Sequence, residues 1–354
     1  MNVIDVLKEA VSRDASDILI SAGAPVSYHI FGELKPKEDG HVLTPEESED
    51  LTYQLLNARN IREFEENWEL DSSYELPGIA NFRVNALKQK GAVGAVLRVV
   101  PLDIPHYTDL GISESFIKKL ASIPNGLVLV TGATGAGKSS TVVSFLEYLN
   151  TEHHVAKHIV TIEDPIEFRM DSKVCIIDQR EIGIDTKDYL VGLKGALRQM
   201  PHVIFVGEMR DRETIEIALM AAETGNLVVS TLATQSASKT INRIIDVFPL
   251  EDQPEVRTRL ALTLRCVVSQ VLLPRCDQPG RVAAREILLV NSPISNLIRE
   301  NKVHQINNAI AGAAKEGMCL LDDSLLNLMM EGVVNVSDAV PRLQDPMKAQ
   351  LVLG

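Results

Sequence analysis

The sequence predicts an α/β protein with two domains, a small α+β domain followed by a larger domain built on a parallel sheet. Up to about residue 100, short β-like segments follow one another through turns, which is typical of a mainly antiparallel sheet. From residue 113 onward, apolar strands alternate with helix-forming stretches, which is typical of a parallel sheet covered on both faces. Between them, Pro101 and Pro105 bound a stiff segment that disfavours helix. We therefore expect domains at 1–100 and 113–354, joined by a linker at 101–112.

The first domain has one helix start that the residues define clearly. Thr44 is expected as the N-cap, Pro45 at the first helical position and Glu47 as the residue that closes a capping box, with the helix running to about Leu56. The other expected elements are helices at 1–14 and 60–68 and strands at 16–20, 26–34, 70–76, 81–88 and 93–100.

The second domain alternates strands and helices along most of its length. The expected strands are 127–130, 159–162, 174–177, 203–206, 227–232, 267–273 and 282–290, and the expected helices are 113–122, about a dozen residues after 139, 186–199 and 212–223. Helical segments near 292–300, 302–314, 320–331 and 336–344 then predict a small C-terminal helical cap, at about 292–354.

A glycine-rich motif joins strand 127–130 to the helix that follows it. The motif reads Gly132-Ala133-Thr134-Gly135-Ala136-Gly137-Lys138-Ser139. In this strand–turn–helix context, Gly-x-x-x-x-Gly-Lys-Ser is the pattern of a P-loop, in which glycines let several backbone N–H groups face one phosphate. Lys138 can reach the β- and γ-phosphates, and the Ser139 hydroxyl can ligate Mg²⁺. We therefore expect these residues and Ser140 to bind a nucleoside triphosphate with Mg²⁺.

Two acidic residues follow apolar strands of the same domain. Glu208 comes after strand 203–206, a position suited to holding Mg²⁺ or a water in its shell, and Glu163 ends strand 159–162, where it can polarise the attacking water. A strand end with acidic residues is more often only solvated. Because Glu163 and Glu208 both follow a complete P-loop in the chain, each after an apolar strand, the catalytic interpretation is favoured for both.

Composition narrows the class of protein further. The formal charge is −13, with 45% apolar and 23% charged residues, so wrapping of nucleic acid by the whole chain is not expected. The N-terminus has no signal-peptide pattern, and no apolar run approaches the ~20 residues needed to span a bilayer. The four cysteines form no C-x-x-C pair, so no zinc site is expected. We expect a cytoplasmic protein that reaches the membrane only through partners.

Beyond the P-loop, several motifs resemble those of the secretion ATPases of the type IV pilus and type II secretion superfamily, specifically the PilT/PilU retraction ATPases. They are Thr161–Phe168 (the Asp box), Gly207–Asp211 (Walker B), Ala221–Gly225, Lys239–Arg243, Asp246–Pro249 and Asn296–Glu300. The resemblance covers nearly the whole chain and implies a PAS-like N-terminal domain before a RecA-like ATPase domain. It also implies a homohexameric motor for pilus retraction at the inner face of the cytoplasmic membrane. The implied partners are a PilC-like platform protein and, in some systems, a paralogous retraction ATPase.

Arg83 and Arg98 each lie within an apolar strand pattern. On that pattern alone, the favoured interpretation is a side chain on the outward face of a sheet. The family resemblance implies instead that both act as arginine fingers, reaching the nucleotide site of a neighbouring subunit in the ring.

One departure from the family pattern bears on the expected activity. The family's His box reads Thr-Leu-His-Thr, whereas this chain has Ala233 in place of the histidine. Because alanine can neither donate to a phosphate nor titrate, we expect weak basal ATPase activity. Three alternatives stay open: a PilU-like accessory ATPase with weak or partner-dependent activity, a ring component that binds nucleotide with little hydrolysis, and a DNA-translocating motor, which the acidic composition disfavours.

Overall fold

The computed structural model describes residues 2–30, 33–100, 103–345 and 347–348. The chain divides into two compact units: one contains the chain up to Ile104 together with Pro165–Arg169, and the other contains the remainder. Parts of four sequence predictions lie outside the described residues, namely residue 1 of the expected helix 1–14, 31–32 of the expected strand 26–34, 101–102 of the linker, and 346 and 349–354 of the C-terminal cap. The predicted α/β class is confirmed.

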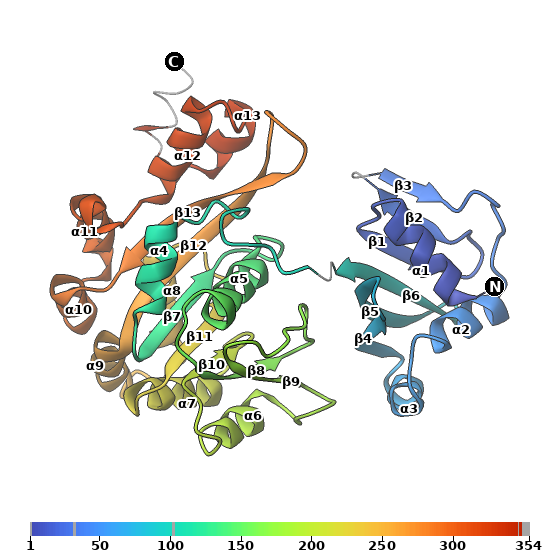
Figure 1. Ribbon diagram of the computed structural model, residues 1–354, viewed down its shortest axis with the longest axis horizontal. Coiled ribbons are helices and arrows are strands. Elements are labelled where there is room, and N and C mark those ends of the chain that lie inside the picture. Colours follow the sequence, from blue (N-terminus) through green and yellow to red (C-terminus); the bar gives the residue numbers. More distant parts are fainter. Residues whose placement is uncertain (1, 31–32, 101–102, 346, 349–354) are drawn as a thin grey trace. The chain divides into compact units, whose positions relative to one another are not determined.

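The N-terminal unit is built on a six-stranded antiparallel sheet in the order β3-β2-β1-β6-β5-β4 (Figure 1). Its strands are β1 (Asp17–Ile20), β2 (Ser27–Ile30), β3 (Glu33–Pro36), β4 (Glu69–Leu76), β5 (Ala80–Gln89) and β6 (Ala92–Val100), and its helices are α1 (Val3–Ser12), α2 (Pro45–Tyr53) and α3 (Ala58–Asn67). The capping box is confirmed, because the Thr44 hydroxyl accepts from the backbone N–H of Glu47, whose carboxylate accepts from that of Thr44.

The expected single strand 26–34 is wrong in one respect. The structure has two strands there, β2 and β3, which pair antiparallel with Ile30 opposite Glu33. Gly32 lies within this β-like run, and a glycine inside such a pattern is itself a sequence signal against one continuous strand.

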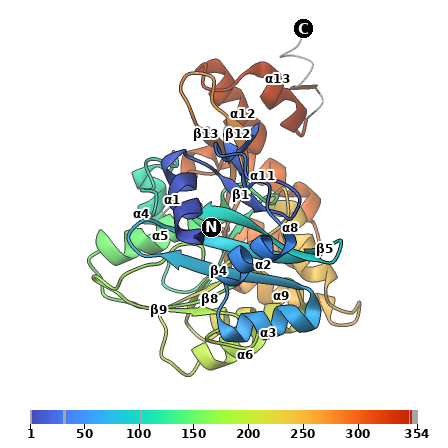
Figure 2. The same cartoon turned by 90° about the vertical axis from the view of Figure 1, so that its right-hand side faces the viewer.

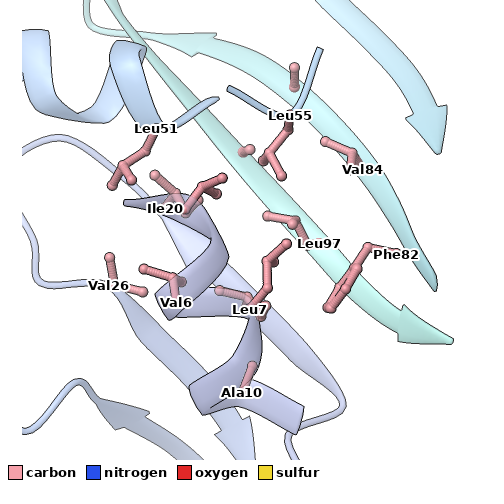
Figure 3. Packing of buried hydrophobic residues seen from close by; sticks show 14 of the residues in the cluster. Val6, Leu7, Ala10, Ile20, Val26, Leu51, Leu55, Phe82, Val84 and Leu97 are labelled. Carbon is pink, nitrogen blue, oxygen red and sulfur yellow. The ribbon is translucent and has the colours of Figure 1, made fainter. Parts of the chain in front are cut away.

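Helices α1 and α2 cover one face of this sheet, and both can be followed in Figure 2. Figure 3 shows Leu7 of α1 facing Leu97 of β6 and Phe82 of β5, with Val6 next to Leu7 on the same helix. All four side chains are at most 1% exposed. Burial of the alternate residues Phe82 and Leu97 leaves the residues next to them in each strand on the opposite face of the sheet.

The second unit is built on a seven-stranded sheet in the order β13-β12-β7-β11-β10-β8-β9. All neighbours are parallel except β12 and β13, which are antiparallel. The strands are β7 (Gly126–Thr131), β8 (His158–Glu163), β9 (Ile176–Glu181), β10 (Val203–Val206), β11 (Leu227–Leu232), β12 (Leu264–Pro274) and β13 (Arg281–Leu289). The helices are α4 (Glu114–Ala121), α5 (Lys138–Thr151), α6 (Tyr189–Ala196), α7 (Arg212–Glu223), α8 (Ala237–Asp246), α9 (Gln253–Thr263), α10 (Ser292–Arg299), α11 (Ile306–Gly312), α12 (Leu321–Met330) and α13 (Val336–Ala339), with 3-10 turns at Val303–Gln305, Ala314–Glu316 and Val340–Arg342.

Three features of this unit differ from the sequence prediction. Helices α8 and α9 were not predicted, although Ser236 caps α8 and Pro254 lies in the first turn of α9. Strand β9 starts and ends later than the expected 174–177. Helix α6 is shorter than the expected 186–199. It begins after Asp188, because the side chain of this residue is the N-cap and accepts a hydrogen bond from the backbone N–H of Val191.

The C-terminal helices pack on the outer end of the sheet. Leu325 of α12 and Ala339 of α13 form a small buried cluster with Leu273 of β12 and Ala284 of β13. Within the described part of the chain, no helix is both long and apolar enough to cross a bilayer.

Candidate active site

The loop between β7 and α5 is shaped by close approaches that only glycine allows. Gly132 has φ of +150°, and a Cβ atom there would lie 2.4 Å from the backbone carbonyl oxygen of Gln270. Gly137 is the N-cap of α5 with φ of +80°, and no side chain of the described residues caps the helix at this point. The N-terminus of α5 is therefore not capped by a described side chain, and a helix N-terminus of this kind favours a bound phosphate.

The side chains of the loop divide between its exposed tip and the helix start. Ala133, Thr134 and Gly135 are exposed, whereas Lys138, Ser139 and Ser140 in the first turn of α5 are half-buried. The Lys138 Nζ donates to the carbonyl oxygens of Gly132 (3.0 Å) and Ala133 (3.1 Å). The ammonium thus lies over its own loop, so a phosphate bound there would compete with these carbonyls for the same protons. The backbone and side chains present fit a nucleoside triphosphate.

The two predicted acids lie at the same edge of the sheet, next to each other in strand order. Glu163 is the last residue of β8, and Glu208 follows β10 by two residues; β8 and β10 are paired in parallel, with Ile162 opposite Val206. Because the carboxyl ends of parallel strands meet at one edge, and the P-loop follows the carboxyl end of β7, these groups face one region of the unit.

The carboxylate of Glu163 is buried and held by hydrogen bonds. Its side chain is only 5% exposed. Its Oε1 accepts from the Thr161 hydroxyl (2.6 Å) and from Nε2 of Gln179 on β9 (3.1 Å). Both contacts fix the carboxylate in place, which suits a group that must orient a water molecule.

Glu208 has a cationic neighbour, Arg210. Arg210 donates from Nε (2.9 Å) and from Nη2 (2.7 Å) to Oε2 of Glu208. The Arg210 side chain is 72% exposed, so this pair contributes little to stability and can rearrange readily. Glu208 and Ser139 together offer the carboxylate and hydroxyl oxygens that Mg²⁺ prefers beside nucleotide phosphates.

Tyr189 of α6 lies against the backbone that carries Glu208. Its hydroxyl is 2.9 Å from the place that a Cβ atom on Gly207 would take. Burial raises the pKa of Tyr189 far above its ordinary value, and the carboxylate of Asp164 raises it further. The phenol therefore stays protonated and can donate a hydrogen bond beside the acids.

The segment after β11 contains Ala233 where the family pattern has histidine. Ala233 is exposed, between the buried Leu232 and the half-buried Thr234. The Thr234 hydroxyl lies 2.7 Å from that of Thr240 in α8, while the Thr231 hydroxyl donates to the Gly207 carbonyl (2.6 Å). Threonines thus hold both ends of this segment, but the hydrogen-bonding group of the histidine itself is missing.

Arg83 and Arg98 lie in the N-terminal unit, directly opposite each other on β5 and β6. Both are on the face away from the core, because their neighbours Phe82 and Leu97 are buried. Like charges opposite each other destabilise a sheet, and here Asp17 of β1 offsets them: its Oδ1 accepts from Nε of Arg98 at 3.0 Å. The structure therefore brings the two arginines together with each other, and places them in a different unit from the P-loop.

The family is decided by comparison with known proteins. A family model described as "Type II/IV secretion system protein" matches residues 3–339. The chain belongs to this family. The resemblance to retraction ATPases that the motifs indicated is also confirmed by the relatives below.

Among curated secretion-system relatives, the type IV pilus retraction ATPase PilT of Pseudomonas aeruginosa is 44% identical over 98% of this chain and 99% of its own length. The type IV pilus ATPase PilU of the same organism is 37% identical over 98% of this chain and 90% of its own length. Among solved structures, the pilus retraction motor PilT with bound ADP is 42% identical, covers 98% of both chains and superposes with a TM-score of 0.90.

Sequence reasoning on this secretion-system protein missed three residues near the predicted site: Gln179, Tyr189 and Arg210. Gln179 lies on an edge strand whose bounds were misplaced, and Tyr189 lies in a helix predicted to start too early. Arg210 was visible within the Walker B motif, where an arginine two residues after the acid is a plausible ion-pair partner. Gln179 and Tyr189 lie near the site only because of the order of the strands in the sheet, which the sequence does not show.

Proposed function

We propose that this protein is an ATP-hydrolysing motor that powers retraction of type IV pili. The observation that carries the proposal is full-length similarity to a relative named as a pilus retraction ATPase, combined with a complete P-loop between β7 and α5. The higher identity to the PilT relative than to the PilU relative favours the motor itself over an accessory ATPase.

The residues of the second unit have distinct roles in this proposal. The N–H groups of 132–140 and the Lys138 ammonium bind the phosphates, and Ser139 and Glu208 hold Mg²⁺. When bound, Mg²⁺ neutralises charge between the β- and γ-phosphates. Glu163 orients the water that attacks the γ-phosphorus and accepts its proton, which its hydrogen bonds from Thr161 and Gln179 prepare it to do.

The remaining positive charge comes from a neighbouring subunit of a homohexamer. We assign Arg83 and Arg98 to stabilising the charge on the transferring phosphoryl group in trans. Arg98 must first leave Asp17, and because its side chain is 64% exposed, breaking this ion pair costs at most about 1 kcal/mol.

The motor works at a membrane without entering it. We propose a cytoplasmic ring, peripheral at the inner face of the cytoplasmic membrane. A PilC-like platform protein of the pilus base receives its motion, and a paralogous retraction ATPase is a second partner. Neither nucleic acid nor direct membrane insertion has a part in this function.

The activity is tested with purified rings and with cells. Wild-type protein should release phosphate from ATP, and Glu208→Ala should abolish release, while Glu213→Ala, which removes an exposed glutamate from the first turn of α7, should not. Expression in a retraction-deficient strain should restore twitching with the wild type and with Glu213→Ala only. If the protein releases phosphate but does not restore twitching, the ATPase activity is supported and the role in pilus retraction is refuted.

The assignment of the arginines is tested by mixing subunits. Arg83→Ala and Arg98→Ala should each lower turnover roughly 10³-fold with ATP binding retained, whereas Arg62→Ala, an exposed arginine of α3, should have little effect. Rings mixed from Arg83→Ala and Lys138→Ala subunits should regain activity, because some interfaces then combine an intact P-loop with intact arginines. Mixed rings as inactive as either parent would place the arginines in cis or outside the reaction.

A further inference from the structure

Gln270 of β12 lies behind the P-loop, more than a hundred residues away from it in the sequence. It comes one position after Ser269, which pairs with Thr131 at the end of β7, so it sits beside Gly132 where the loop begins. Gln270 is 4% exposed, and its backbone oxygen is the atom that a side chain at Gly132 would strike. One residue of a remote strand thus lines the start of the loop with its backbone.

The side chain of the same residue reaches the other end of the loop. Its Nε2 donates to the carbonyl oxygen of Ala136 (2.6 Å), and its Oε1 accepts from the Thr141 hydroxyl (3.0 Å). A Cβ atom on Gly137 would lie 3.3 Å from Nε2. Because a backbone carbonyl can only accept, Nε2 must face Ala136 and Oε1 must face Thr141, so the orientation of the amide follows from its partners.

The hydrogen bond to Ala136 determines where the next N–H group points. In a planar trans peptide, the carbonyl of one residue and the N–H of the following residue point in opposite directions. With the Ala136 carbonyl held toward β12, the N–H of Gly137 points away from β12. Gly137 is also the N-cap of α5, so this N–H adds to the helix start.

We propose that Gln270 is a positioning residue for nucleotide binding, which holds the 136–137 peptide so that the Gly137 N–H meets a phosphate. Ala136 is buried, so without Gln270 its carbonyl oxygen would lose a partner that water replaces poorly. The peptide would then rotate to find another donor, and the loop would lose a phosphate contact. Thr141 supports the arrangement by fixing the amide.

The test compares nucleotide affinity with stability in the full chain. Gln270→Met keeps the volume and removes both hydrogen bonds, and Thr141→Val removes only the donor that fixes the amide. The matched control is Val268→Ala, which lies on the same strand face two residues away and is 1% exposed. Binding of ADP and of AMP is measured by titration calorimetry, and unfolding by scanning calorimetry.

Gln270→Met should bind ADP about tenfold more weakly, since one buried hydrogen bond that organises a phosphate contact is lost. Thr141→Val should follow in the same direction with about a threefold loss. The preference for ADP over AMP should fall in both, because the β-phosphate depends most on the loop. Val268→Ala should lower the unfolding temperature and leave both affinities unchanged.

A lower unfolding temperature for Gln270→Met with unchanged ADP affinity would overturn the proposal and make Gln270 a packing residue. If Gln270→Met does not fold, Thr141→Val decides: an unchanged ADP-to-AMP preference in that variant would equally overturn it. Weakened binding together with a reduced preference would support it. None of these outcomes depends on whether the ring drives pilus retraction.

Discussion

Gly207→Ala is expected to destabilise the second unit through one contact. Gly207 connects β10 to Glu208, and its φ lies outside the left-handed region, so the backbone alone tolerates alanine. An added Cβ atom, however, would lie 2.9 Å from the hydroxyl oxygen of Tyr189, 3.3 Å from the carbonyl oxygen of Ile162 and 3.5 Å from Cα of Glu163. Only the first of these is too short for any ordinary contact, so the cost should come mainly from the tyrosine hydroxyl.

Overpacking of this kind costs about 1–3 kcal/mol, which for a unit of this size lowers the unfolding temperature by roughly 2–12 °C. Turnover should fall as well, because the strain displaces the backbone of Glu208. The double variant Gly207→Ala/Tyr189→Phe should recover most of both losses, while Tyr189→Phe alone should stay near the wild type. Scanning calorimetry and steady-state phosphate release measure the two effects. A double variant as unstable as Gly207→Ala would refute the reasoning and identify the Ile162 carbonyl as the obstacle.

Three further outcomes are expected. Ala233→His should raise turnover at saturating ATP; a rate equal to that of the wild type would show that this chain does not need the histidine. Burial raises the pKa of Glu286, so the contribution of this group to stability is greatest below the ordinary carboxyl pKa and is lost as pH rises through the raised value. Glu286→Gln, which keeps the acceptor for the Ala237 N–H, should therefore unfold at a higher temperature than the wild type at pH 8, with the difference vanishing toward pH 4.5. Asp17→Asn should lower the free energy of unfolding of the N-terminal unit by at most about 1 kcal/mol in low salt, measured by urea titration. At roughly 0.5 M salt the Debye length is about 4 Å, so the ion pair is screened and the loss should disappear. A loss that persists at this salt concentration would show that the ion pair with Arg98 is not its cause.

The parts of the fold that the sequence predicted well are those with local causes. Helix α7 was predicted with its observed bounds, as were strands β10 and β11, because each is an uninterrupted periodic or apolar run. The division into β2 and β3 was missed because a single glycine, Gly32, lies within a long β-like run. Helix α9 failed for another reason: its polar residues surround a narrow buried stripe that includes Val256 and Leu260, so the sequence shows little helical contrast.

The candidate site divides in the same way. Lys138 and Ser139 follow from an eight-residue motif, and the two acids follow from the rule that strand ends meet at one edge. Tyr189 and Gln270 could not be found, because nothing near them in the sequence states which strand or loop they will face. The strand order β12-β7-β11-β10-β8 had to be known first.

Glycines in the two nucleotide motifs carry more information than the motifs express. Gly132 and Gly207 each lie where an atom from a distant element approaches, a Gln270 oxygen in one case and the Tyr189 hydroxyl in the other. Each motif therefore shows that no side chain fits at its glycine, but it does not show which distant residue packs against that glycine. It follows that the phosphate-facing side of the loop is encoded locally, while its opposite side depends on β12. A substitution on β12 that leaves all motif residues intact can thus change nucleotide affinity, and a search restricted to the motif would not detect the cause.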